Sequence, residues 1–243
     1  MHPYKNPLKK NLLILSGGIE AIEGIKVAKK MGLRTIVCDG NKNAPGRSYA
    51  DEFLIGNIYD PDEIKNIISK YAKKNSIDGV ITIASDAVRS VSAVAKLLSL
   101  SGNSMKTSIL STDKLKMKKV FQKYSLPIPN YVGISNRNEL HKQIEHFSDA
   151  VLKPVDNRGS RGVIRINKNS DVDKAFDYSM NFSSSKKLIL EKWLHGYQLS
   201  SESLVISSKT HLCGTADRNY SNLKNTFPYV IEDGGETPSR FYP

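Results

Sequence analysis

Short apolar runs alternate with helix-period segments along the first 110 residues of the chain. The apolar runs have the length of strands rather than helices, and they lie at residues 11–15, 33–38, 53–55 and 78–84. Between them, apolar residues recur three and four positions apart, which predicts helices with one buried face at 22–31, 60–71 and 87–98. Strands separated by helices predict an α/β fold with a doubly wound parallel sheet.

After residue 110 the pattern becomes a mixture of strands and helices. Short strands are predicted at 131–134, 149–153, 162–166 and 188–190, and two longer antiparallel strands at 198–206 and 210–215. Helices are predicted at 112–124, at 138–147 and after residue 170. Residues 217–243 show no periodicity and are rich in Asn, Gly, Pro and Ser, which predicts loop. We therefore predict two domains, 1–110 and 111–243, the second of the α+β class.

Three local sequences predict where helices begin. Asp60 precedes Pro61 and Glu63, which is the order of an N-cap, a first-turn proline and a first-turn acid. Thr112 is predicted as an N-cap, and Ser170 opens a sequence that resembles a capping box.

Composition places the chain among globular proteins. Its hydrophobic content is 39% and its charged content 25%, which is enough for a buried core. No apolar run has the length of a membrane span, and the run at 12–15 is too short for a signal peptide. Cys38 and Cys213 both lie in strand-like apolar runs, so we expect two buried, reduced thiols and infer a cytoplasmic protein.

The net charge is +12, from 36 basic and 24 acidic residues. Lysines are spread along the chain, with no aromatic platform or Cys/His zinc pattern beside them, which favours a solvated surface over nucleic-acid binding. The lysines at 116, 118, 119 and 123 are accordingly interpreted as a solvated helix face. Phosphates on a small substrate fit the same positive charge.

The segment at 149–162, DAVLKPVDNRGSRG, carries the clearest chemical signal. It reads as an apolar strand that ends at Lys153, followed by a loop with two glycines and two arginines. Glycines let backbone N–H groups approach an anion, and arginines add positive charge, which suits a polyphosphate. The G-x-x-x-x-G-K-[ST] spacing of a Walker A loop is absent. By itself Lys153 would be read as a strand-end lysine that reaches water.

A second segment, LILEKWLHG at 188–196, changes that interpretation. An adenine ring needs a flat apolar wall and a strand edge that offers N–H and C=O groups, and residues 189–194 supply such an edge. A nearby acid or amide can hold ribose hydroxyls, and a lysine on a facing strand can neutralise phosphates. The two segments together predict a nucleotide site.

These residues resemble the ATP-grasp superfamily over roughly residues 11–215. The resemblance rests on Lys153 with its glycine loop, the run Glu191-Lys192-Trp193-Leu194 and the turn at Gly196. The run from Glu191 to Gly196 is similar to the corresponding segment of D-alanine–D-alanine ligases. With Gly17-Gly18, Asp39, Ala44-Pro45 and Asp51, the first domain resembles the pre-ATP-grasp domain of carbamoyl phosphate synthetases and purine-pathway carboxylating ligases. The resemblance divides 111–243 into a small subdomain at about 111–195 and the start of a large subdomain at 196–243.

The resemblance implies roles for twelve residues in ATP binding. Lys114 and Lys153 would contact the phosphates, and Glu191 would receive the adenine amino group or orient its surroundings. The flap over the phosphates would comprise Arg158, Gly159, Ser160, Arg161 and Gly162. Lys192 and Leu194 would offer backbone groups, Gln198 stands where the family has a ribose-binding glutamate, and Glu202 is its substitute on the same strand face.

The implied reaction is ATP-dependent ligation of a carboxylate (or bicarbonate) and an amine through an acylphosphate, with Mg²⁺. The family's Glu…Glu-x-Asn metal pattern is absent, because the late acids are Asp217, Glu232, Asp233 and Glu236 in the irregular tail. We therefore assign no metal ligands and expect an incomplete chain that stops before the metal-binding part. Expected partners are small-molecule substrates, and a second copy or a complementing C-terminal chain.

Two other functions fit parts of the sequence. Without metal ligands, the protein would be a non-catalytic ATP-binding module. Asp39, after the second strand, lies where a dehydrogenase binds ribose, although Gly17-Gly18 followed by Gly24 does not make G-x-G-x-x-G. Trp193 is interpreted as packing, and Arg218 as either a substrate-anion ligand or an exposed loop arginine.

Overall fold

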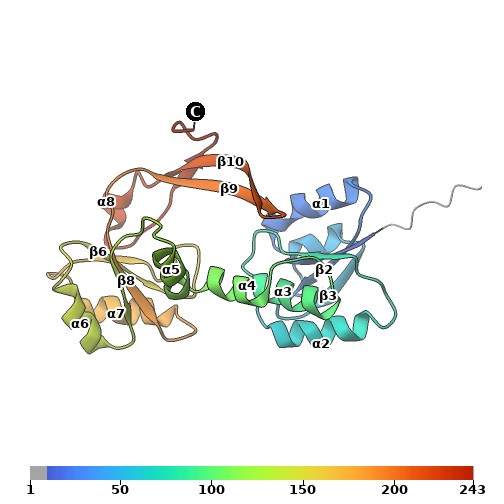
Figure 1. Ribbon diagram of the computed structural model, residues 1–243, viewed down its shortest axis with the longest axis horizontal. Coiled ribbons are helices and arrows are strands. Elements are labelled where there is room, and N and C mark those ends of the chain that lie inside the picture. The colour runs from blue at the N-terminus through green and yellow to red at the C-terminus, as the bar shows by residue number, and fades with distance from the viewer. Residues whose placement is uncertain (1–9, 243) are drawn as a thin grey trace, which may run out of the picture. The chain divides into compact units, whose positions relative to one another are not determined.

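The computed structural model describes residues 10–242, and the chain divides into two compact units. The first unit ends at Ser111 and the second begins at Thr112. Each unit has its own hydrophobic core and is described by itself (Figure 1).

A four-stranded parallel sheet in the order β3-β2-β1-β4 forms the first unit. Its strands are β1 (Asn11–Leu15), β2 (Arg34–Asp39), β3 (Glu52–Ile55) and β4 (Gly79–Ile81). Its α-helices are α1 (Ile22–Lys30), α2 (Pro61–Tyr71) and α3 (Val88–Leu97), with short 3₁₀ helices at Ile19–Ala21 and Pro45–Tyr49.

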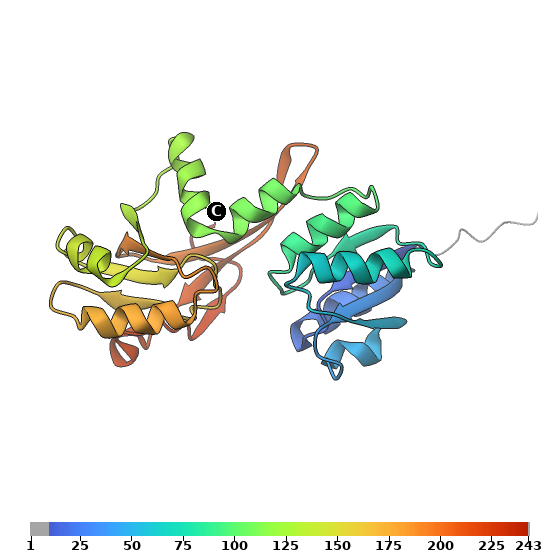
Figure 2. The same ribbon diagram turned by 90° about the horizontal axis from the view of Figure 1, so that it is seen from below.

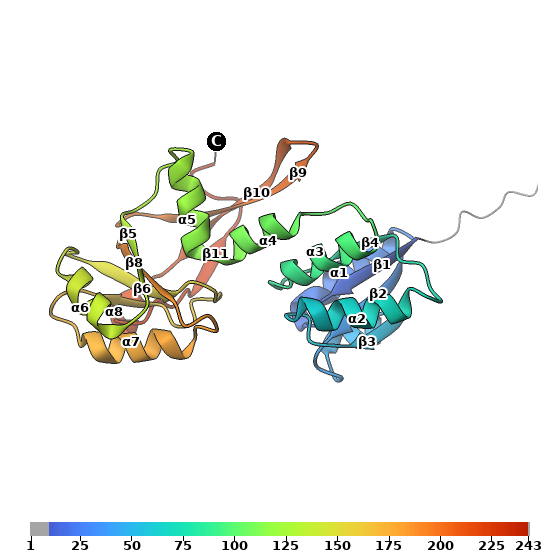
Figure 3. The same ribbon diagram turned by 60° about the horizontal axis from the view of Figure 1, so that its bottom comes forward.

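Helices cover both faces of this sheet, because alternate strand residues point to opposite faces. Ile14 packs in a cluster with Ile25 of α1, whereas Leu13 packs with Ile64 of α2 and Val94 of α3. Figures 2 and 3 show this arrangement around the parallel strands. The predicted doubly wound α/β sheet is confirmed.

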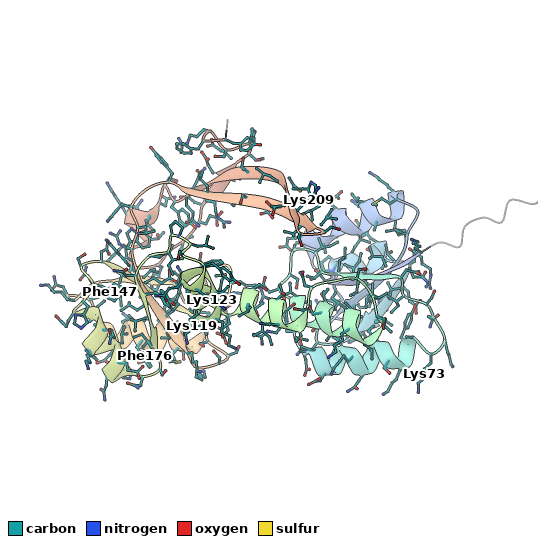
Figure 4. The ribbon with its side chains drawn as sticks, viewed as in Figure 1. Lys73, Lys119, Lys123, Phe147, Phe176 and Lys209 are labelled. Atoms are coloured by element: carbon teal, nitrogen blue, oxygen red, sulfur yellow. The ribbon has the colours of Figure 1, made fainter. Side chains whose placement is uncertain are left out.

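The second unit contains two sheets. The first is antiparallel in the order β5-β8-β6-β7, with strands β5 (Tyr131–Ile134), β6 (Ala150–Pro154), β7 (Ile164–Ile166) and β8 (Leu188–Lys192). Helices α6 (Arg137–Ile144) and α7 (Val172–Asn181) pack on one face of it. Phe147 and Phe176, labelled in Figure 4, join Leu152 and Leu190 in that core.

The second sheet has the order β11-β10-β9. Strands β9 (Gln198–Ile206) and β10 (Lys209–Asn219) form a long antiparallel hairpin, and β11 (Gly234–Glu236) pairs with the end of β10. Lys209 follows the turn of this hairpin (Figure 4). The short helix α8 (Leu223–Thr226) lies in the connection from β10 to β11.

That connection returns to the first sheet of the unit. Tyr229 forms an isolated bridge with Ile164 of β7, and the N–H of Arg165 donates to the carbonyl of Pro228 at 2.8 Å. The ring of Tyr229 also lies 5.0 Å from the ring of Tyr178 on α7. The two sheets are therefore joined by these contacts as well as by the chain between β8 and β9.

The prediction of loop for residues 217–243 is wrong in part. Strand β10 continues through Asn219, because Gln198 and Leu199 pair with it on one side and β11 on the other. Pairing with neighbouring strands holds this polar segment extended, and a search for apolar periodicity cannot detect it.

Two predicted helix starts also need correction. Thr112 ends a helix that was not predicted, α4 (Met105–Thr112), and Asp113 caps α5 (Lys114–Lys123) by accepting from the N–H of Lys116. Asp171 rather than Ser170 caps α7, whereas Asp60 caps α2 as predicted. No helix among residues 10–242 is long and apolar enough to span a membrane.

The two cysteines lie in different environments. Cys38 is buried in the core of the first unit, and burial raises the pKa of its thiol to about 12. Cys213 is exposed, so the prediction of two buried thiols is wrong for it. Residue 213 lies where the pairing of β10 with β9 shifts register, which places it outside the regular ladder.

Asp51 joins the start of β3 to β2 and α1. Its carboxylate accepts from the N–H of Thr35 at 2.8 Å and from the hydroxyl of Thr35 at 3.0 Å, and it lies 2.8 Å from the Lys29 ammonium. Burial alone would raise the pKa of Asp51, but the bonds from Lys29 and Thr35 outweigh it and lower the pKa to about 2.

We expect this carboxylate to make the first unit sensitive to acid. Because the folded pKa is about 2 and the ordinary value 3.8, the stabilisation is complete above the ordinary value and is lost as the pH falls through the folded value. The side chain is 33% exposed, so we expect about 1 kcal/mol rather than the full linkage value.

Thermal unfolding of the protein and of Asp51→Asn measures this effect. The difference in melting temperature should be clear at neutral pH and should shrink as the pH approaches 2. Asp62→Asn, at a carboxylate that is 84% exposed, is the control. An equal Asp51→Asn deficit at both pH values would show that its charge is not the source.

Candidate functional site

A cavity of about 1080 Å³ lies within the second unit and gathers most of the predicted site residues. Its size is at the upper end of the range of ligand pockets, roughly 300–1,000 Å³. All predicted residues except Gly162 and Glu202 line it. Those that do are Lys114, Lys153, Arg158, Gly159, Ser160, Arg161, Glu191, Lys192, Leu194 and Gln198.

A buried carboxylate that lines this cavity is paired with two lysines, of which Lys153 also lines it. Glu191 on β8 is 4% exposed. Its Oε1 lies 3.0 Å from the ammonium of Lys153 on β6, and its Oε2 lies 3.2 Å from that of Lys118 on α5. The Oε1 contact is an ion pair without the alignment of a hydrogen bond, so this oxygen still has an unused lone pair. The cluster therefore combines net positive charge with an available acceptor.

Strand alternation explains why these groups face one another. Leu190 points into the core under α6 and α7, so its neighbour Glu191 points to the other face of the sheet. On the paired strand β6, Leu152 points into the same core and its neighbour Lys153 points to the face that carries Glu191. Sequence therefore places Lys153 and Glu191 on one face, as the two predicted segments require.

Lys118 was interpreted as part of a solvated helix face, and that interpretation is wrong. It is 9% exposed, whereas Lys119 and Lys123 on the same helix are exposed (Figure 4). Lys118 lies three residues after Leu115 and three before Phe121, a spacing that shares a helix face with apolar residues. This spacing was the signal that could have identified it.

Lys114 connects the start of α5 to the loop after β6. Its N–H donates to the carbonyl of Val155 at 2.9 Å, and its ammonium donates to the carbonyl of Asn157. The first turn of α5 is thereby fixed next to the cationic loop. This arrangement brings Lys114 and the loop to the same cavity, as predicted.

The loop at 157–162 has an unusual backbone. Gly159, Ser160 and Gly162 have φ values of +60°, 54° and +75°. A Cβ on Gly159 would meet no atom within 4 Å, whereas one on Gly162 would lie 2.8 Å from both Pro154 and Phe182. Gly162 therefore packs the base of the loop, and it lies outside the cavity lining although it was predicted in the flap.

The chain beyond β8 presents an unpaired edge to the cavity. The N–H of Lys192 donates to the carbonyl of Asn130 at 2.8 Å, but β5 begins only at Tyr131, and Pro129 has no N–H. Within residues 10–242, the N–H of Leu194 has no hydrogen-bond partner. This edge is the kind of backbone donor site that the sequence predicts at Lys192 and Leu194.

Gln198 and Glu202 share one face of β9, as predicted from their spacing. Gln198 lines the cavity and pairs in register with Arg218 of β10, which also lines it. Glu202 is exposed, pairs in register with Gly214 and does not line the cavity. Its predicted role as a substitute for Gln198 has no support in this geometry.

Trp193 packs against a salt-bridged arginine. Its ring lies 4.6 Å from the guanidinium of Arg165, which donates to Asp149 at 2.9 Å. The hydrogen bond to Asp149 raises the pKa of Arg165, which keeps this cation charged. The prediction that Trp193 serves packing agrees with this contact.

The other sequence features give no second site. Asp39 accepts from the N–H groups of Gly17 and Asn41, both at 2.8 Å, so its two oxygens already hold loops of the first unit. Among residues 10–242, no group of three or more His, Cys, Asp or Glu side chains could hold a metal ion.

Comparisons with known proteins agree with the geometry. Residues 25–102 match the family model of the ATP-grasp N-terminal domain, and residues 111–242 match that of the ATP-grasp domain. A formate-dependent phosphoribosylglycinamide formyltransferase of Methanococcus maripaludis is 22% identical over 189 residues, covering 76% of this chain and 48% of that protein. The chain thus spans about half the length of the curated relatives it matches.

Solved structures resemble the fold over nearly the whole chain. An L-amino acid ligase from Bacillus licheniformis has a TM-score of 0.79 at 19% identity, covering 96% of this chain and 56% of that one. N5-carboxyaminoimidazole synthetase from Staphylococcus aureus complexed with ADP has a TM-score of 0.74 at 18% identity, covering 96% and 60%. At these identities the likeness concerns the fold alone.

Removing the charge of Glu191 should destabilise the second unit. Glu191→Gln leaves Lys118 and Lys153 without their common partner, for which we expect a loss of about 3–5 kcal/mol in unfolding free energy. Adding Lys118→Met should recover part of that loss, since one uncompensated buried charge is removed. Denaturant unfolding of the single and double variants measures this, and equal stabilities would contradict it.

The two loop glycines provide a second, matched test. Gly162→Ala combines a left-handed backbone with contacts at 2.8 Å, so we expect it to cost about 2–3 kcal/mol of stability. Gly159→Ala meets open space at φ +60° and should cost about 1 kcal/mol. If both substitutions cost the same in thermal unfolding, packing under Gly162 does not anchor the loop.

Proposed function

The chain belongs to the ATP-grasp family, and on this basis we propose that its second unit binds ATP and that the protein acts in ligation of a carboxylate to an amine through an acylphosphate. The observation that carries the proposal is the buried Glu191 carboxylate, which lines the cavity, pairs there with Lys153 and holds Lys118 on its other oxygen. Lysines that only solubilise a surface are hydrated by water and do not need a buried carboxylate as partner. A phosphate-binding site needs its cations in fixed positions.

In this proposal the triphosphate lies against the first sheet. Lys114 and Lys153 neutralise its charge, and Arg158 and Arg161 cover it from the loop, whose open backbone at Gly159 allows close approach. The arginine side chains and loop N–H groups suit phosphate oxygens, since guanidinium groups bind phosphate in a planar, bidentate way.

The purine in this proposal lies against the edge beyond β8. The free N–H of Leu194 donates to a ring nitrogen, and the carbonyl of Lys192 accepts from the amino group. Glu191 has an oxygen without an aligned hydrogen bond. Its principal contribution is to orient Lys118 and Lys153, the second of the two roles expected for it. Gln198 lies next along the cavity, where its amide suits a ribose hydroxyl.

The proposed reaction has two balanced steps. A carboxylate oxygen of the acceptor attacks the γ-phosphorus of ATP, the bond to the β–γ bridging oxygen breaks, and ADP leaves. The amine nitrogen then attacks the acyl carbon, inorganic phosphate leaves, and the amine loses a proton to solvent. The chain's lysines and arginines stabilise the charge that spreads over the transferring phosphoryl group. No residue of this chain is assigned as a Mg²⁺ ligand.

A second candidate function follows from the same observation. A protein that binds ATP without completing the metal site would be a non-catalytic ATP-binding module. The relatives are about twice as long as the matched part of this chain, so a second copy or a complementing chain is proposed as partner for activity. Measuring ADP release after adding candidate carboxylates and amines separates a ligase from a silent binder.

We expect ATP, but not NAD, to raise the melting temperature of the protein. Binding to the folded state alone stabilises by about 2.7 kcal/mol at a ligand concentration of 100 times Kd. Lys153→Ala should abolish this rise, because it removes the cation that Glu191 orients toward the cavity. Lys123→Ala, at an exposed lysine on α5, should leave the rise unchanged. A normal rise with Lys153→Ala would remove Lys153 from the site.

A further inference from the structure

One cation of the cavity has no role in the proposed nucleotide site. Arg240 follows β11 in the chain and lines the cavity together with Tyr197 and Leu199, at the start of β9. These residues belong to the second sheet and its flanking segments, whereas the proposed phosphate ligands come from the first sheet, the loop beside it and the start of α5. The second substrate of a ligase must contact wall that the nucleotide leaves free.

A buried acid holds Arg240 in place. The Nε of Arg240 lies 2.7 Å from Asp217, whose side chain is only 4% exposed. Asp217 also accepts from the hydroxyl of Ser239 at 2.6 Å, and the N–H of Ser239 donates to the carbonyl of Thr215 at 3.1 Å. The segment that carries Arg240 is thereby fixed along β10, so binding a ligand costs little further side-chain order.

Two aromatic rings lie next to the guanidinium and in contact with each other. The ring of Tyr197 lies 4.8 Å and that of Phe241 5.2 Å from Arg240, and the two rings lie 4.9 Å apart. Rings on a guanidinium face fix its plane and leave its N–H edge accessible. Within residues 10–242, no acceptor bonds the terminal Nη atoms of Arg240, whose side chain is 59% exposed.

Arg218, the other arginine of the second sheet in this cavity, differs in this respect. Its terminal nitrogen is paired with Glu232, and that hydrogen bond raises the pKa of Arg218. Asp217 and Arg218 are adjacent on β10 and therefore point to opposite faces of the strand. Arg218 shares a strand face with Gln198, toward the proposed ribose. Arg240 contacts Asp217, which points to the other face of β10, and both arginines line the cavity.

From these contacts we propose that Arg240 binds the carboxylate of the acceptor acid, and that this acid carries a flat apolar body. The inference rests on the proposed ligase function. The two Nη groups of a guanidinium match the two oxygens of one carboxylate. Tyr197 and Leu199 supply the planar and apolar surface on which an aryl or unsaturated group next to that carboxylate lies. Asp217 is a positioning residue that acts through Arg240.

The test uses 4-fluorobenzoate as the probe acid and 4-fluorobenzamide as its neutral counterpart, titrated into the ATP-loaded chain and followed by ¹⁹F NMR. The benzoate should bind more tightly than the benzamide. Arg240→Gln should weaken benzoate binding at least about tenfold, the effect of losing charge-assisted hydrogen bonds, and leave benzamide binding within about twofold. Arg240→Lys should recover part of the affinity.

Arg137→Gln is the matched control. Arg137 also pairs with acids and lies 5.2 Å from an aromatic ring, that of Phe176, but it is on α6 outside the cavity. It should not change benzoate binding. Tyr197→Ala, at a residue that is 74% exposed, should weaken both probes, because it removes the shared aromatic contact.

Two results would overturn the inference: equal benzoate affinity in Arg240→Gln and the parent protein, or benzoate binding no tighter than benzamide. Melting curves with ATP, recorded for the same samples, separate the two proposals. An Arg240-dependent benzoate site without ATP stabilisation would end the ligase proposal and keep the subsite. ATP stabilisation with no effect of Arg240→Gln on benzoate binding would end the Arg240 subsite and keep the ATP-binding proposal.

Discussion

The desolvated carboxylate of Glu191 is the constraint on which the second unit depends. A buried charge is tolerated only where opposite charge and hydrogen bonds compensate it. Glu191 meets this condition by fixing one ammonium from β6 and one from α5. Helix α5 and strands β6 and β8 are thereby coupled through one acid. If either lysine moved into solvent, the buried carboxylate of Glu191 would lose part of the opposite charge that compensates it. The two ammonium groups are thereby fixed in position, as the proposed phosphate site requires.

The two sheets of the second unit divide the chemistry between them. The first sheet and its left-handed loop provide lysines, arginines and a free strand edge, which suit a nucleotide. The second provides an amide at Gln198 and, in the further proposal, a guanidinium held by Asp217 next to two aromatic rings. Two substrates that must react can then be held by separate walls of one cavity, with the transferring phosphoryl group between them.

Much of this was readable from sequence, because local rules and final structure agree. The alternation of strands and helices predicted the parallel sheet, and the segments around Lys153 and Glu191 predicted a nucleotide site, although the register that puts both side chains on one face comes from the structure. Lys118 was missed because a lysine in a lysine-rich helix looks solvated until its buried partner is known. The strand at Asp217 and the positions of Ser239 and Arg240 were missed because contacts between residues about 20 positions apart, rather than local pattern, determine them.

The bridge between Tyr229 and β7 limits how the cavity can change shape. Residues 193–197 link the sheets covalently at one place, and the contacts of Pro228 and Tyr229 fasten them at another. Two sheets joined only by the chain could rotate apart about that connection, whereas a second connection restricts this rotation. Separation of the two sheets would therefore have to break the Tyr229–Ile164 bridge and the hydrogen bond from Arg165 to Pro228.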